Sequence, residues 1–125
     1  MKKPIKLVMF DLDGTLADTG QDLADAVNHT RVHFDLEPLP EALVHTHVGR
    51  GVEHLLRHSL PADSADHFVE VMRVFLARYE GHLLDTTILY PGVHEILDYF
   101  QGKRRGVVSN KMHRLTVAVL RGLGV

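Results

Sequence analysis

The spacing of apolar positions changes twice along the chain. Residues 5–10 are apolar except for Lys6 and are rich in strand-forming side chains, so they predict a buried β-strand. From Gln21 onward, apolar residues recur every three or four positions, which is the spacing of a helix buried on one face. A short strand-like run returns at residues 105–108. The pattern therefore predicts a strand, a long helical block and a second strand.

The block between the two strands is predicted to be helical throughout. Glycine and proline divide it into helices at about 21–34, 40–45, 52–60 and 64–80. Two further helices, at 93–100 and 112–122, flank the second strand. Because helices that alternate with short apolar strands are typical of parallel α/β sheets, we expect this fold class. We divide the chain into an α/β core, residues 1–18 and 83–125, and an inserted helical cap, residues 19–82.

Two strands are too few for a stable parallel sheet, since each strand needs neighbours and cover on both faces. The sheet is therefore expected to be incomplete. We expect the chain to be the N-terminal part of a longer one.

Composition narrows the possible functions. The chain has 125 residues, a formal net charge of −2 and no cysteine. A disulfide framework, a thiolate metal site and a cysteine nucleophile are thus excluded. The balanced charge gives no reason to expect nucleic acid as a partner. The short apolar run after Met1 fits neither an export signal nor a membrane span, so we expect a cytoplasmic protein with no membrane partner.

Two acidic residues follow the first strand directly, in the run Asp11-Leu12-Asp13-Gly14-Thr15. The glycine lets the chain turn and direct backbone N–H groups at an anion. One carboxylate can attack phosphorus and the other can transfer protons. Acids this close to a phosphate need a divalent cation such as Mg²⁺. The alternative is a surface turn, but ligands of α/β sheets bind at the carboxyl ends of strands, which favours a site.

The residues around this loop resemble the first motif of the haloacid dehalogenase-like hydrolases, and Val107-Val108-Ser109-Asn110-Lys111 resembles their second. The helical insert is similar to the mobile cap of that superfamily. Within the superfamily, Gly49-Arg50-Gly51-Val52 and Tyr90-Pro91-Gly92-Val93 resemble the phosphoglycolate phosphatases most closely. The resemblance implies a Rossmann-like core and hydrolysis of a small phosphomonoester, 2-phosphoglycolate, through an aspartyl-phosphate.

The resemblance also assigns roles to individual residues. Asp11 becomes the nucleophile and Asp13 the acid and base, and both become ligands of Mg²⁺. Phosphate would be bound by the Ser109 hydroxyl and by backbone N–H groups of Leu12, Asp13 and Asn110. The family's later lysine and further acidic ligands have no counterpart before Val125, and Lys111 is a poor substitute because it sits beside Ser109. We therefore expect residues 1–125 alone to be inactive.

Arg50 lies between two glycines at a predicted loop tip of the cap. A guanidinium there could bind a substrate carboxylate and set specificity, or it could be an ordinary solvated turn residue.

Histidine is unusually frequent, with 10 residues, and two pairs have the i, i+4 spacing of a helical metal site: His29 with His33, and His54 with His58. A solvated polar face is the favoured interpretation, since His29 is expected on the same side as Asp22 and Asp25. The remaining alternatives are another small-phosphate phosphatase, a sugar-phosphate mutase, a catalytically silent fragment, or a histidine-rich metal-binding module.

Overall fold

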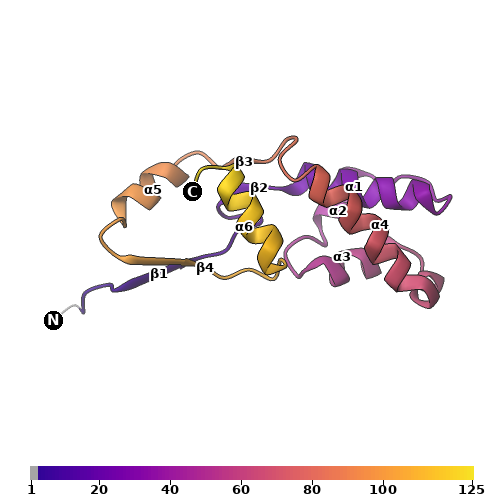
Figure 1. Cartoon of the computed structure of the whole chain (residues 1–125), viewed down its shortest axis with the longest axis horizontal. Coiled ribbons are helices and arrows are strands. Elements are labelled where there is room, and N and C mark those ends of the chain that lie inside the picture. The colour runs from indigo at the N-terminus through magenta and orange to yellow at the C-terminus, as the bar shows by residue number, and fades with distance from the viewer. Residues whose placement is uncertain (1–2) are drawn as a thin grey trace.

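The computed structural model describes residues 3–125, and Figure 1 shows an elongated molecule with its sheet at one end and most of its helices at the other. Strand β1 (Leu7–Phe10) pairs in parallel with β4 (Arg104–Val107), and Phe10 lies opposite Val107. The predicted parallel α/β class is therefore confirmed. The α-helices are α1 (Gly20–His33), α2 (Glu41–His45), α3 (Val52–Ser59), α4 (Phe68–Gly81), α5 (Val93–Tyr99) and α6 (His113–Gly122).

The helical segment, residues 20–81, has its own apolar core. Helix α1 packs along α4, and Val27, Phe75 and Tyr79 are fully buried there. Phe75 and Tyr79 lie one turn apart on α4, as Leu23 and Val27 do on α1, so each helix presents one apolar face to the other. The predicted helix at 64–80 differs in its first turn, because residues Ala62–His67 form a 3₁₀ helix (η1) before α4 begins.

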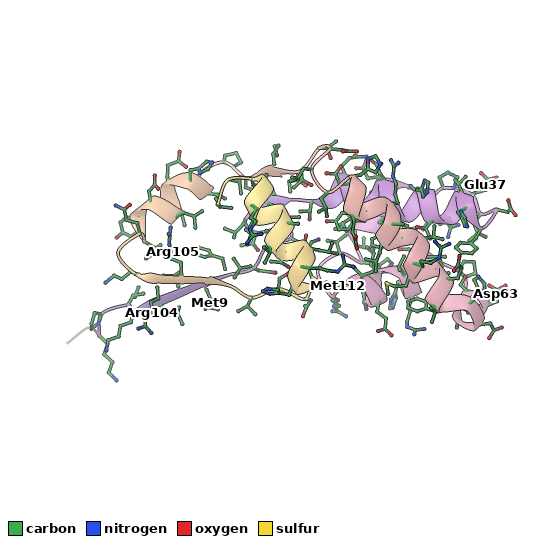
Figure 2. All side chains as sticks on the ribbon, in the orientation of Figure 1. Met9, Glu37, Asp63, Arg104, Arg105 and Met112 are labelled. Atoms are coloured by element: carbon green, nitrogen blue, oxygen red, sulfur yellow. The ribbon has the colours of Figure 1, made fainter. Side chains whose placement is uncertain are left out.

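The sheet is less enclosed than the sequence predicted. Leu7 and Met9 of β1 are 54% and 49% exposed, so the expectation of a buried first strand is wrong for this chain. The cause is the lack of cover on one face: Figure 2 shows Arg105 on the α5 side of the sheet and Met9 on the opposite side. Arg105 donates to the Leu97 carbonyl of α5 at 2.9 Å.

Two segments link the sheet to the helical segment, and they pair with each other. Strand β2 (Ala17–Asp18) runs antiparallel to β3 (Ile88–Leu89), a pairing that the sequence analysis did not predict. Beside this ribbon, Asp22 is buried and accepts hydrogen bonds from the backbone and hydroxyl groups of Thr86 and Thr87, at 2.7 to 3.1 Å. The expected solvated position of Asp22 is therefore wrong, because the residue joins the two linkers.

Candidate active site

The two acids flank a buried anchor at the end of β1. Leu12 is fully buried, and its carbonyl accepts from three successive N–H groups, those of residues 15, 16 and 17, at 3.0 to 3.1 Å. Gly14 has a φ of +78°, a conformation that suits glycine, and donates to the Ala17 carbonyl at 3.0 Å. The tight turn holds the acids on either side of Leu12 at the carboxyl end of the strand.

Asp11 is the accessible acid. Its side chain is exposed, and its Oδ1 accepts the Leu12 N–H at 2.8 Å. The same N–H is one of the predicted phosphate donors, a role that stays a prediction. Asp11 also lines a cavity of about 320 Å³ together with Ser109 and Asn110, the residues that follow β4. The parallel pairing of β1 and β4 thus brings the two predicted motifs to one edge of the sheet.

Asp13 is held rigidly. Its side chain is only 8% exposed, and its Oδ1 accepts from Lys111 Nζ at 2.9 Å and from the Thr19 hydroxyl at 2.6 Å. Both bonds use the same oxygen, Oδ1, and among residues 3–125 no hydrogen bond involves Oδ2. An ion pair with a second hydrogen bond fixes the side chain in one orientation.

Lys111 makes contacts that the sequence did not predict. Its side chain is 3% exposed, and Nζ donates to the Tyr79 hydroxyl at 2.8 Å as well as to Asp13. Burial, with smaller contributions from the charges of Asp13 and Asp22, raises the pKa of Tyr79, so its hydroxyl stays protonated. Lys111 therefore connects the β1 loop, the β4 loop and α4. One sequence feature could have indicated that Lys111 lies near the acids: it comes two residues after Ser109, in the loop that follows a predicted strand.

Ser109 and Asn110 hold the loop after β4 in place. Ser109 Oγ accepts the Lys111 N–H at 3.1 Å, which is the geometry of a local side-chain turn. Asn110 Nδ2 donates to the Gly49 carbonyl at 2.8 Å, and this bond joins the β4 loop to the helical segment. The predicted second motif is thus already in contact with the predicted cap.

The glycines around Arg50 make a close approach possible. Gly51 has a φ of +92°, and a Cβ there would lie 3.2 Å from the Asn110 carbonyl oxygen. Gly49 and Gly51 line a cavity of about 20 Å³ together with Asp13 and Lys111. Arg50 itself is exposed, and within residues 3–125 it is not among those lining this cavity. The structure therefore brings the loop, but not the Arg50 side chain, to the acids.

The structure separates the two predicted histidine pairs and adds a third histidine to one of them. His29 and His33 are exposed on α1, in agreement with the favoured solvated interpretation. His54 and His58 lie together on α3, but they are joined by His47, which the sequence analysis did not group with them.

A third cavity, of about 500 Å³, lies between α5, β4 and α6 and is lined mostly by apolar residues. It contains no pair of neighbouring acids, so it is a weaker candidate for phosphate chemistry. In residues 3–125, the helices are too short or too polar to cross a membrane.

Comparison with known proteins identifies the same family that the two motifs resemble. The family model of the haloacid dehalogenase-like hydrolases matches residues 8–125. A phosphoglycolate phosphatase of Chromobacterium violaceum is 38% identical over 130 aligned positions, which cover 98% of this chain and 59% of the relative. The chain thus spans little more than half the length of the curated relatives that it matches.

Solved structures agree with the fold. The crystal structure of a predicted phosphoglycolate phosphatase from Haemophilus somnus 129pt is 28% identical, with a TM-score of 0.79 over 95% of this chain and 57% of the other. A structure described as a haloacid dehalogenase-like hydrolase from Bacteroides fragilis has a TM-score of 0.86 at 19% identity, covering 98% of this chain and 59% of the other. The second likeness concerns the fold alone.

Proposed function

The chain belongs to the haloacid dehalogenase-like hydrolase family, and from this membership and the geometry of the acid loop we propose that the complete protein hydrolyses a small phosphomonoester. The observation that carries the proposal is the difference in exposure and hydrogen bonding between two neighbouring acids. Asp11 is exposed beside a cavity, whereas Asp13 is fixed by Lys111 and Thr19. A nucleophile needs access to phosphorus, and a proton donor needs a defined orientation.

The proposed reaction has two steps. An Asp11 carboxylate oxygen attacks phosphorus, and the bond between phosphorus and the leaving oxygen breaks while Asp13 gives that oxygen a proton. Asp13 then accepts a proton from a water molecule, which attacks the phosphorus of the aspartyl-phosphate and releases inorganic phosphate. Asp11 and the protonated Asp13 are thereby regenerated. In both steps we propose that the Ser109 hydroxyl donates to a phosphate oxygen, a role supported by its place just after the adjacent strand, on the same cavity as Asp11.

The residues present fit a magnesium ion. The exposed Asp11 carboxylate lines the cavity beside Ser109, and the Asp13 backbone carbonyl, two residues later in the same loop, would offer a second oxygen donor. Oxygen is the ligand type that Mg²⁺ prefers. When bound, Mg²⁺ would offset the negative charge that the carboxylate and the phosphate bring together.

We infer that 2-phosphoglycolate is the substrate from the names of the relatives and from the position of the Arg50 loop. That loop contacts Asn110 through Gly49 and Gly51, so its backbone lies close to the acids. We propose that the exposed Arg50 side chain turns from its present position toward a bound substrate and pairs with the substrate carboxylate. A cytoplasmic location stays a prediction from the sequence.

The test measures phosphate release from 2-phosphoglycolate by the complete protein, with Mg²⁺ and with excess chelator. We expect activity only with Mg²⁺. Asp11→Asn and Asp13→Asn should each lower kcat at least about 1,000-fold, because each removes a chemical role. Asp18→Asn is the matched control, since Asp18 is an exposed acid a few residues away. Mass spectrometry of quenched turnover should find the phosphoryl group on Asp11.

Several results would contradict the proposal. Retention of more than a few per cent of activity by Asp11→Asn would remove the nucleophile assignment. A panel that includes neutral phosphoesters and sugar phosphates distinguishes a mutase, which would isomerise a sugar phosphate rather than release phosphate.

A further inference from the structure

Three imidazoles meet on the helical segment, away from the acid loop. His47 lies in the turn after α2, whereas His54 and His58 lie one turn apart on α3. One potential ligand atom from each histidine lies within 4.8 Å of the other two. The ring centroids of His54 and His58 are 4.0 Å apart, and the His47 ring is 5.0 Å from that of His58.

The hydrogen bonding of His58 leaves one nitrogen available to a ligand. Its Nδ1 lies 2.8 Å from the His54 carbonyl oxygen. A carbonyl can only accept, so Nδ1 carries the proton and Nε2 presents a lone pair. A backbone carbonyl that orients a ligating imidazole in this way is a common feature of protein metal sites.

From this grouping we propose that His47, His54 and His58 form a binding site for a divalent transition-metal ion such as Zn²⁺. Nitrogen ligands suit Zn²⁺, Cu²⁺ and Ni²⁺, whereas Mg²⁺ prefers oxygen. Tetrahedral Zn²⁺ needs ligand nitrogens about 3.3 Å apart, so the rings must close by about 1.5 Å or less from their present limit of 4.8 Å. His47 and His54 are half-buried and His58 is exposed, so side-chain rotation can provide this movement.

The site would also act on the loop that carries Arg50. His47 precedes Gly49, and His54 follows Gly51, so an ion held by both histidines would tie together the two ends of this loop. The same loop contacts the β4 loop through the bond from Asn110 to the Gly49 carbonyl. We therefore expect a bound ion to restrict the motion of the loop. The metal site itself does not depend on the proposed phosphatase activity.

The experiment titrates the 125-residue chain with Zn²⁺ by calorimetry, in the presence of millimolar Mg²⁺. We expect saturable binding of one ion, with histidine side-chain NMR signals shifting for His47, His54 and His58. His47→Gln and His58→Gln should each raise the Kd at least about 10-fold, since even an outer-shell partner of a metal ligand contributes that much. Circular dichroism checks that each variant keeps its helix content.

The double variant His29→Gln/His33→Gln is the matched control. It removes the other i, i+4 pair, which is exposed on α1, and it should leave the Kd unchanged. Asp11→Asn should also leave Zn²⁺ binding unchanged, which separates this site from the acid loop. The proposal is overturned by the absence of saturable binding, by unchanged affinity in both the His47 and His58 variants, or by loss of binding in the control.

Discussion

The helical segment and the two-stranded sheet differ in how completely they are packed. In the helical segment, side chains as large as Tyr79 and Phe75 are fully buried. In the sheet, Leu7 and Met9 are about half exposed. The acid loop lies between these regions and is held from both: Leu12 is buried among residues of the sheet region, and Asp13 binds Lys111, which also donates to Tyr79 of the helical segment. The geometry of the candidate site therefore depends on contacts with the helical segment as well as on strand pairing.

The largest effect is expected from Lys111→Met, which keeps the apolar stem but removes the charge. Removing one partner of a buried ion pair typically costs about 3 to 5 kcal/mol of unfolding free energy, because the other charge is left buried alone. Here that charge is on Asp13. Urea unfolding followed by circular dichroism measures the loss, and Lys103→Met, at an exposed lysine, is the control. A loss equal to that of the control would show that the ion pair between Lys111 and Asp13 does not stabilise the fold.

Two leucine substitutions compare the packing of the two regions directly. Leu56 is fully buried in the helical segment, so Leu56→Ala should cost about 2 to 5 kcal/mol of unfolding free energy. Leu7→Ala removes a half-exposed side chain from β1 and should cost less than about 1 kcal/mol. Thermal or urea unfolding of the two variants gives the comparison. Equal costs would mean that the sheet contributes as much packing as the helices do.

Arg50→Ala tests whether the helical segment also contributes to specificity. If the guanidinium pairs with the carboxylate of 2-phosphoglycolate, Arg50→Ala should lower kcat/KM in the complete protein. The loss should correspond to about 2 to 4 kcal/mol of transition-state stabilisation. A neutral phosphoester should be affected much less. Measuring both substrates on one variant cancels any general disturbance of the loop. Equal losses for the two substrates would return Arg50 to the solvated-turn interpretation.

Local patterns predicted most of the secondary structure and the acid loop, because strand, turn and glycine signals lie within a few residues of each other. They could not predict the partners of these residues. Lys111 meets Tyr79 only because α4 packs beside the β4 loop, and the two are 32 residues apart in sequence. Likewise, the i, i+4 rule finds His54 with His58, but His47 joins them only through the fold of the intervening loop.

Asp22 shows the same limit, because its surroundings could not be inferred from its place on α1. An acid near a helix start is usually solvated, yet the donors of Asp22 come from residues 86 and 87, which are 64 and 65 positions away. Burial pushes the pKa of Asp22 upward, but the hydrogen bonds from Thr86 and Thr87 outweigh burial and hold the pKa below its ordinary value. The carboxylate form is therefore the one that stabilises the junction between sheet and helices.

The smallest effect is expected from Asp22→Asn, which replaces one acceptor oxygen with a donor facing the donors of Thr86 and Thr87. The variant should lose about 1 to 3 kcal/mol of unfolding free energy at pH 7, the usual cost of unpaired buried polar groups. Asp25→Asn, at an exposed acid on the same helix, should change the unfolding free energy by less than about 0.5 kcal/mol.

Because the folded pKa of Asp22 is depressed, the stabilisation from its carboxylate is complete above the unfolded pKa of about 4 and is lost as the pH falls through the lower folded value. The difference between the native chain and Asp22→Asn, measured by urea unfolding, should thus be constant from pH 7 to about pH 5 and shrink below pH 4. A difference that stays constant below pH 4 would show that the charge on Asp22 does not hold the two linkers together.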